Sequence, residues 1–202
     1  MNSGLKHEER FPLDPLQKDL RLFTKSEKEQ SHIIIGYRGI TFQDPDRYTL
    51  EVLEAILAGQ GGRLFRELRE KASLAYSVSP FNMKGIDTGY FGVYIGCSPE
   101  KGPKAIEMIK EELQKMVDYE PTEEEVLRAK RYLVGRNHID LQRNGTQASS
   151  ILFDEIYDID CRETFKFADH LKEITAEDIK RLAGRLVGTH SVTVAVGPTQ
   201  PW

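Results

Sequence analysis

The hydrophobic pattern of this 202-residue chain changes period along its length, and that change constrains the fold more than any other feature. Up to about residue 97, most apolar residues form short β-branched or aromatic runs, which are typical of strands. From about residue 98 they recur at spacings of three and four, which is typical of amphipathic helices. Because the strands come early and the helices gather later, we expect an α+β fold rather than a doubly wound parallel sheet. The expected architecture is a two-layer sandwich, with a mostly antiparallel sheet packed against several helices.

The strand-like runs divide into two pairs and a last strand. The first pair is expected to form a hairpin or two neighbouring antiparallel strands, and the second pair is joined by a hairpin turn at residues 84–87. Their predicted ranges are 18–24, 31–38, 74–83, 89–97 and 191–196.

Several helices have recognisable starts. Asp44 and Pro45 predict an N-cap and a first helical residue, where the missing N–H of proline costs nothing. Thr122 and Glu125 form the pattern of a capping box, which opens a long helix to about residue 142, and Asn144-Gly145 ends it. The other predicted helices span residues 63–71, 98–117, 146–157, 162–173 and 176–187.

The chain is expected to form one domain over residues 18–198, after a linker at 1–17 that holds Pro12 and Pro15. Its formal charge of −4 gives no indication of nucleic-acid binding. No stretch approaches the roughly 18 apolar residues of a membrane span, and the first residues lack the apolar region of a signal peptide. The compartment therefore stays undetermined, with the cytoplasm as the default.

Metal-binding patterns are absent from the sequence. The five histidines are scattered, and neither H-x-x-x-H nor the inverted H-x-x-E-H occurs. Two cysteines, Cys97 and Cys161, are too few for a disulfide framework or a cysteine zinc site. We therefore expect no zinc site in this chain.

The glycines Gly59, Gly61 and Gly62 allow three interpretations. A phosphate-binding loop requires a strand before the glycines and a helix after them, whereas here a helix precedes them. Capping of that helix and a tight joint to the next helix explain the glycines better. A close approach of a peptide backbone to this loop is the remaining interpretation.

The segment from Gly61 to Val78 is the most distinctive part of the chain. Arginines recur every three residues on its short helix, ending at Arg69, and Tyr76 follows on the next strand. A guanidinium can bind carbonyls or carboxylates, and a tyrosine hydroxyl can donate to a developing oxyanion. The same residues also fit a surface ion pair with Glu67 or Glu70 and a half-buried aromatic side chain.

Residues 62–76 resemble a signature of the pitrilysin/insulinase family of zinc metallopeptidases, which includes the mitochondrial processing peptidases. In the non-zinc domain of that family a glycine loop leads to S/G-R-L-F-x-x-L-R-E-K-x-x-L-A-Y, and this chain reads GRLFRELREKASLAY. The resemblance covers residues 18–198 in order. Its further matches are residues 30–33, 46–48, 121–130, 174–179 and 192–197.

The resemblance implies a division of labour between two domains. One domain carries zinc on the H-x-x-E-H motif, and a similarly folded second domain supplies an Arg and a Tyr seven residues apart. Arg69 and Tyr76 have that spacing. By resemblance, Arg69 grips the peptide substrate and Tyr76 stabilises the tetrahedral oxyanion, while Gly59, Gly61 and Gly62 contact the substrate. Gln60 interrupts the usual run of three glycines, which puts that last contact in question.

The expected function is thus that of a substrate-binding domain of a zinc metalloendopeptidase, inactive by itself. Its implied partners are a peptide substrate and a zinc-bearing domain or subunit of the same family. No nucleic-acid partner and no membrane span are expected. The alternative is a catalytically inert scaffold or assembly subunit of the same fold. A stand-alone zinc peptidase lacks any ligand motif in this sequence.

Overall fold

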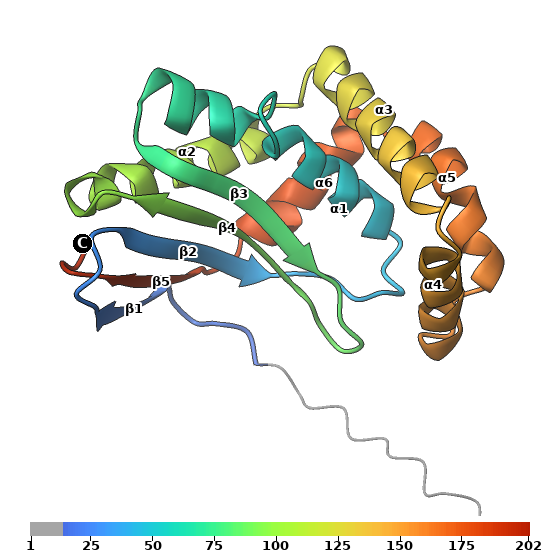
Figure 1. Cartoon of the computed structure of the whole chain (residues 1–202), viewed down its shortest axis with the longest axis horizontal. Coiled ribbons are helices and arrows are strands. Elements are labelled where there is room, and N and C mark those ends of the chain that lie inside the picture. The colour runs from blue at the N-terminus through green and yellow to red at the C-terminus, as the bar shows by residue number, and fades with distance from the viewer. Residues whose placement is uncertain (1–13) are drawn as a thin grey trace, which may run out of the picture.

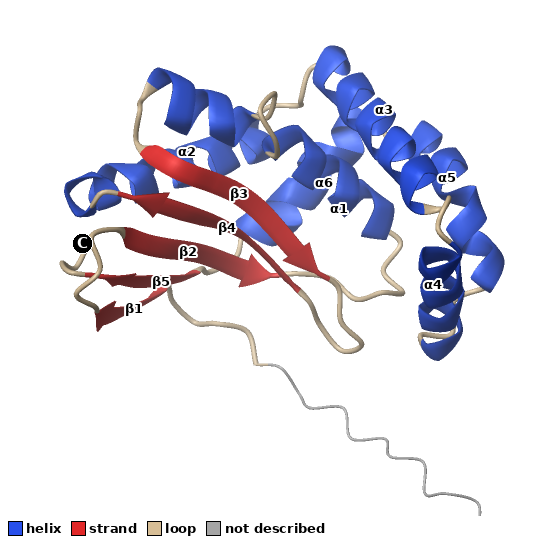
Figure 2. Ribbon diagram, in the orientation of Figure 1, coloured by secondary structure: helices blue, strands red, loops and turns tan. Residues whose placement is uncertain are grey.

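The computed structural model describes residues 14–202, and a five-stranded sheet forms one layer of the fold (Figures 1 and 2). The strand order is β1-β5-β2-β4-β3, and the helices lie on one side of the sheet. This is the α+β sandwich that the order of strands and helices predicts. The strands are β1 (Leu20–Lys25), β2 (Ser31–Arg38), β3 (Ala75–Met83), β4 (Tyr90–Cys97) and β5 (Val192–Gly197).

The helices connect these strands and cover one sheet face. The predicted helix at 98–117 is a 3-10 turn followed by α2, and the one at 162–173 is likewise a 3-10 turn followed by a short helix. The helical elements are α1 (Arg47–Leu57), η1 (Phe65–Lys71), η2 (Pro99–Lys101), α2 (Gly102–Asp118), α3 (Glu123–Asp140), α4 (Asn144–Ile156), η3 (Cys161–Lys166), α5 (Phe167–Glu173) and α6 (Ala176–Val187).

Alternation along β2 separates the two faces of the sheet. Ile33 and Ile35 are completely buried against the helices, whereas His32 and Ile34 on the opposite face are exposed. This is the period-2 pattern of a strand with one face in the core and one outside it. The helices α1, α2 and α6 supply most of the remaining core, including Leu53, Ile109 and Leu182.

The predicted adjacency of the first two strands is wrong. β5 lies between them, pairing parallel with β1 and antiparallel with β2. Consecutive strands are neighbours only about two-thirds of the time. Here β5 buries Thr193 and Ala195 on the helix side, so a strand in this position completes the core that β1 and β2 alone would leave open.

The first helix begins at Arg47 rather than at Pro45. Asp44 does not cap it: its carboxylate accepts the backbone N–H of Asp46 at 2.9 Å, forming a turn before the helix. The carboxylate of Asp46 pairs with Arg181 of α6 at 2.6 Å, and Arg185 of α6 pairs with both Asp44 and Asp46. These ion pairs fix α1 against α6, which explains the later start.

The other helix boundaries follow the sequence closely. Thr122 and Glu125 form the predicted capping box at the start of α3. A second capping box, between Thr175 and Asp178, opens α6. Asn144 does not end a helix, because α3 stops at Asp140 and Asn144 is already the first residue of α4. The two helices are separated by the turn at residues 141–143.

Candidate functional site

The predicted site residues lie in one segment, residues 58–77, which connects α1 to β3 above the edge of the sheet (Figure 1). α1 ends at the C-cap Ala58, and Gly59 follows with a φ of +72°, a left-handed conformation that glycine adopts without strain. A side chain on Gly62 would collide with the carbonyl group of Ala58. Gly59 and Gly62 thus form the tight helix joint that the capping interpretation of the glycines predicts.

Gly61 is exposed, and it has neither the positive φ of Gly59 nor the close backbone contact of Gly62. The nearest atoms to a Cβ placed on this residue belong to the guanidinium of Arg128, at 3.8 Å. Gly61 is therefore not required by packing, and its backbone remains accessible from outside. The proposed contact of this loop with a peptide stays a prediction.

Arg63 anchors the segment to α3. Its Nε and Nη2 donate to the two carboxylate oxygens of Glu125 at 2.7 and 2.8 Å. The Arg63 guanidinium, together with the Thr122 amide, lowers the pKa of Glu125 to about 2, against the opposing effect of burial. Of the three arginines that recur along this segment, Arg63 therefore has a structural role and is not free to bind a ligand.

Arg69 lies on η1, where the backbone is π-helical. The amide of Ala72 donates to the carbonyl of Glu67, five residues earlier, at 3.2 Å. Such turns are rare and occur frequently at functional sites. Arg69 is exposed, and its guanidinium carbon lies 5.0 Å from the centre of the Phe65 ring. Within the described part of the chain it makes no ion pair with Glu67 or Glu70, so that alternative is not observed.

The turn after η1 is held in a left-handed conformation. Ser73 has a φ of +51°, which a non-glycine residue adopts only at a cost. The ammonium of Lys101 donates to the Ser73 carbonyl at 2.9 Å, and the Leu74 amide donates to the Leu68 carbonyl at 2.8 Å. These two hydrogen bonds stabilise the strained turn and set where β3 begins.

Tyr76 is the extra residue of a β-bulge. Ala75 pairs with Cys97 and Ser77 with Gly96, so Tyr76 has no partner on β4. A bulge redirects a side chain locally, and bulges recur beside active sites. The Tyr76 side chain is 60% exposed and, among the described residues, forms no hydrogen bond. Its hydroxyl is therefore free to donate to a group brought from outside the domain.

Arg69 and Tyr76 thus occupy consecutive elements, η1 and β3, which pack against each other. Arg69 lies within the π-helical segment, Tyr76 is the bulge residue, and the left-handed Ser73 lies between them. Both side chains are exposed and lack polar partners in the described residues. Chemically, the arrangement offers one guanidinium and one hydroxyl donor to an external carbonyl or oxyanion.

A metal ion does not fit the side chains of this segment. Over residues 14–202, no group of three or more histidine, cysteine, aspartate or glutamate side chains could hold one. Arg69 and Tyr76 are the predicted site residues of this segment, and a guanidinium is not a metal ligand. Among the described helices, none is long and apolar enough to cross a membrane.

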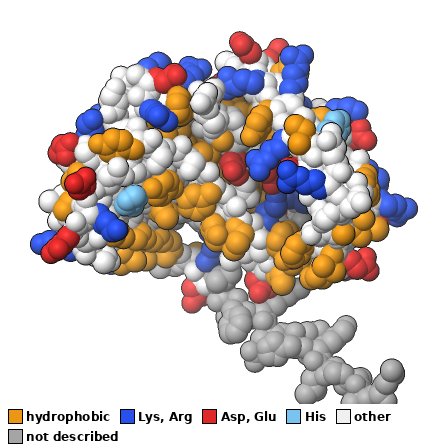
Figure 3. All heavy atoms as spheres, in the orientation of Figure 1, with side chains coloured by type: hydrophobic (Ala, Val, Ile, Leu, Met, Phe, Trp, Pro, Cys, Tyr) orange, Lys and Arg blue, Asp and Glu red, His pale blue; other side chains and the backbone are white. Residues whose placement is uncertain are grey.

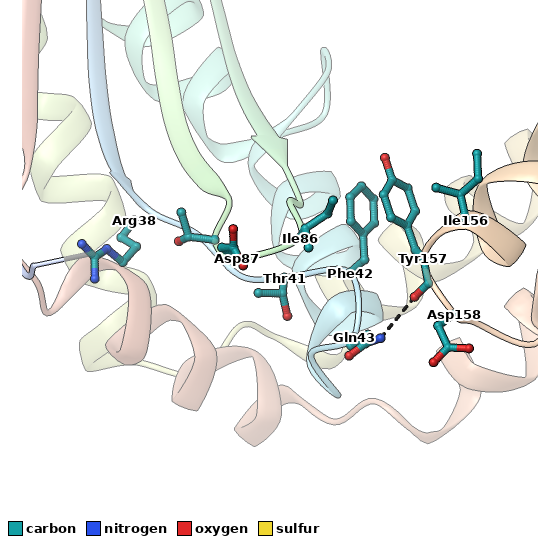
Figure 4. Close-up of a pocket in the computed structure, with 10 residues that line it drawn as sticks. Arg38, Thr41, Phe42, Gln43, Ile86, Asp87, Ile156, Tyr157 and Asp158 are labelled. Carbon is teal, nitrogen blue, oxygen red and sulfur yellow. Dashed lines mark hydrogen bonds between the residues drawn. The ribbon is translucent and has the colours of Figure 1, made fainter. Parts of the chain in front are cut away.

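One cavity lies away from the predicted site, and no motif in the sequence indicated it. It has a volume of about 610 Å³ and lies between the β2–α1 loop, the β3–β4 hairpin and the end of α4. Figure 4 shows Ile86, Phe42, Tyr157 and Ile156 along one side, with Gln43 bonded to the Tyr157 carbonyl at 3.2 Å. The rings of Phe42 and Tyr157 stack with their centres 3.8 Å apart.

Comparison with known proteins defines the class to which this fold and segment belong. Residues 2–133 match the family model described as the peptidase M16 inactive domain. The chain therefore belongs to the peptidase M16 family of zinc proteases, and it is the inactive, C-terminal domain of that family. The family resemblance of the sequence is confirmed.

Two curated relatives illustrate the match. An uncharacterized zinc protease of Streptomyces coelicolor is 30% identical over 171 residues, which is 84% of this chain and 37% of the relative. An uncharacterized zinc protease of Mycobacterium leprae is 29% identical over 175 residues, or 86% of this chain and 39% of the relative. The chain thus spans about two-fifths of the length of these relatives.

Solved structures show the same fold. A peptidase M16 inactive domain from Pseudomonas fluorescens superposes with a TM-score of 0.81 at 23% identity, covering 91% of this chain and 44% of the other. A protease from Helicobacter pylori superposes with a TM-score of 0.77 at 22% identity, covering 95% and 48%. At these identities the structures establish the fold alone.

Proposed function

We propose that this domain supplies Arg69 and Tyr76 to a zinc site carried by another domain or subunit, for the hydrolysis of peptide bonds. The observation that carries the proposal is the exposed, unpartnered pair of Arg69 in a π-helical segment and Tyr76 in a β-bulge. A self-contained scaffold has no need to maintain a left-handed Ser73 and an unpaired Tyr76 in an exposed position. Both the left-handed Ser73 and the exposed Tyr76 are explained if the Tyr76 hydroxyl is supplied to a partner domain.

Tyr76 is proposed to act as a hydrogen-bond donor. Its hydroxyl can donate to a carbonyl oxygen as negative charge develops there. The bulge holds the side chain outside the domain, at the position where β3 begins. The role of the zinc ion on the partner is to activate water and polarise the scissile carbonyl.

Arg69 is proposed to bind the substrate backbone. Its side chain extends over the Phe65 ring, which limits its conformations without neutralising its charge. The guanidinium can donate two parallel hydrogen bonds to peptide carbonyls or to a carboxylate. Because Arg63 is already committed to Glu125, Arg69 is the freer of these two cations.

The glycine loop is proposed to let a peptide backbone approach closely. Gly61 has no side chain to block its exposed backbone, whereas Gly59 and Gly62 shape the turn. The domain thus offers a substrate-facing backbone beside two donor side chains, and it is catalytically incomplete without its partner.

The test uses the full chain assembled with a zinc-bearing domain that carries H-x-x-E-H, assayed on a fluorogenic peptide. Tyr76→Phe removes only the hydroxyl and is expected to lower kcat about 100- to 1,000-fold. Tyr119→Phe is the matched control, since Tyr119 is also largely exposed, at 68%, and lies at the end of α2. It should leave kcat unchanged.

Arg69→Ala is expected to raise KM more than it lowers kcat, because it removes a substrate contact. Arg66→Ala on the same helix is its control, since that side chain is 45% exposed and reaches Glu67 only at 3.8 Å. An unchanged kcat in Tyr76→Phe would overturn the oxyanion role. Failure of every H-x-x-E-H partner to give hydrolysis would instead favour the scaffold alternative.

A further inference from the structure

The helix α4 presents its polar side to its own domain. Gln147 donates to the carbonyl of Leu141 at 2.6 Å, and the carboxylate of Asp154 accepts from the Thr164 hydroxyl at 2.5 Å. None of the residues of α4 is buried. The half-buried positions are polar, namely Thr146, Gln147, Ser150 and Asp154.

The opposite side of α4 is the apolar one and faces outward. At about 100° per residue, most of the exposed positions share one helix face, and the exposed Ile151 and Phe153 lie at its two borders. Leu152 is 57% exposed and Ile156 is 60% exposed. The outward α4 face, as we name it, comprises Gly145, Ala148, Ser149, Leu152, Glu155 and Ile156. In Figure 3, hydrophobic side chains gather at the lower right of the molecule, in the region of α4.

This orientation is the reverse of the usual one. An amphipathic helix on a globular domain normally turns its apolar stripe to the core. Here Ile156 lines the cavity of Figure 4, and so does Ile86 of the β3–β4 hairpin, which is itself 75% exposed; Phe42 and Tyr157 lie between the two. The apolar surface thus continues from the outward α4 face onto the hairpin, and it fits a partner rather than solvent.

We propose that the outward α4 face binds the same face of a second copy of this chain, with the two helices antiparallel across a two-fold axis that passes through the face between Ala148 and Leu152. In that arrangement the two halves of the face complement each other. The first half is small, with Gly145, Ala148 and Ser149, and the second half is large, with Leu152 and Ile156. Each copy therefore places its large residues over the small residues of the other.

The charges of α4 support the same partner. Arg143 precedes the helix, and Glu155 lies in its last turn; both are exposed, and neither side chain has a polar partner among residues 14–202. A cation at the N-terminus and an anion at the C-terminus oppose the dipole of the helix to which they belong. In an antiparallel dimer these charges become favourable, because Arg143 of one copy lies near Glu155 and the C-terminal end of the other helix.

The small size of the contact limits the affinity of the dimer. A 13-residue helix is about 20 Å long, so the face belongs to the small class of interfaces that form weak, reversible dimers. The inference concerns the surface of this chain alone and stands whether or not Arg69 and Tyr76 act in hydrolysis.

Sedimentation equilibrium of the full chain, from about 10 to about 500 µM, tests the proposal. The wild type is expected to approach the dimer mass at the upper end, and Leu152→Asp to weaken association by at least about tenfold. Leu22→Asp is the matched control: Leu22 is also 57% exposed but lies on the open face of the sheet. It should associate like the wild type.

A charge exchange identifies the occupant. Arg143→Glu and Glu155→Arg should each weaken self-association, whereas a mixture of the two variants should form a mixed dimer, because both contacts then join opposite charges. Thermal unfolding of each variant should match the wild type, which excludes misfolding.

A wild type that stays monomeric at the highest concentration would overturn the proposal. The outward α4 face would then be expected to bind the region of the longer relatives that this chain does not cover. Equal weakening by Leu22→Asp, or a mixture that forms no mixed dimer, would also contradict it.

Discussion

Arg63 and Glu125 join the start of the candidate site to the start of α3 through two parallel hydrogen bonds, of 2.7 and 2.8 Å. The same Glu125 carboxylate accepts the backbone N–H of Thr122 at 2.9 Å, as the capping box requires. One side chain therefore fixes both the first turn of α3 and the segment that leads to Arg69. The two side chains of the pair are only 16% and 13% exposed, so solvent weakens the contact little.

Replacing Glu125 by Gln should destabilise the domain. The amide still fits the capping box, but the charge-assisted pair with Arg63 is lost, and the guanidinium is left partly buried without a counter-ion. We expect a loss of about 1–3 kcal/mol in the free energy of unfolding, measured by urea denaturation. Glu124→Gln is the control, since that neighbour is exposed and unpaired among the described residues, and its effect should stay within about 0.5 kcal/mol.

The same carboxylate predicts a pH dependence. The folded-state pKa of Glu125 is about 2, below its ordinary value of 4.5. The unfolded chain therefore binds a proton more readily, and the stabilisation is complete above pH 4.5 and is lost as the pH falls toward 2. The free energy of unfolding should decline over that range in the wild type. The decline should be shallower in Glu125→Gln. Equal slopes of the free energy of unfolding against pH in the two proteins would show that pairing with Arg63 does not lower the pKa of Glu125.

Two glycine substitutions should have opposite effects on stability. Gly62→Ala brings a methyl group into the Ala58 carbonyl, so the helix joint must shift, at a cost of about 1–3 kcal/mol. Gly135→Ala lies within α3 with no atom within 4 Å of the added carbon, and it should raise stability by about 0.5–1 kcal/mol. Thermal unfolding measures both. A neutral Gly62→Ala would mean that the joint tolerates a side chain.

Ser73→Gly should relieve the strained turn before β3. A left-handed conformation costs a non-glycine residue about 1–2 kcal/mol, and the greater freedom of glycine in the unfolded chain offsets part of that gain. We expect a net rise in stability of roughly 0.5 kcal/mol. Ser79→Gly, in the regular part of β3, should instead lower stability. Calorimetry distinguishes the two, and a loss in Ser73→Gly would show that the serine side chain supports the turn.

Local signals in the sequence predicted much of the fold. β2 and α6 have the predicted bounds, because each is a strongly periodic run with a clear start. Boundaries that depend on distant partners were harder to predict. α1 begins two residues late because Asp44 and Asp46 pair with α6, some 135 residues away in the sequence.

The candidate site was predictable in its residue types but not in its geometry. The spacing of Arg69 and Tyr76, together with the family resemblance, singled them out. The pairing of Arg63 with Glu125 could not be predicted, because the two residues lie 62 positions apart. The bulge at Tyr76 depends on register with β4, and the inward polar side of α4 depends on where the tertiary structure places that helix.

The place of β5 in the sheet has a consequence for how the chain is made. Among the described strands, β1 hydrogen-bonds only to β5, which is the last of these strands to be synthesised. A nascent chain therefore leaves the ribosome with β1 unpaired and with one edge of β2 uncovered until residues 192–197 emerge. Exposed strand edges promote aggregation, so folding of the sheet must be completed after translation of nearly the whole domain. A chain truncated before Val192 would retain its helices but lose the strand that joins the first two.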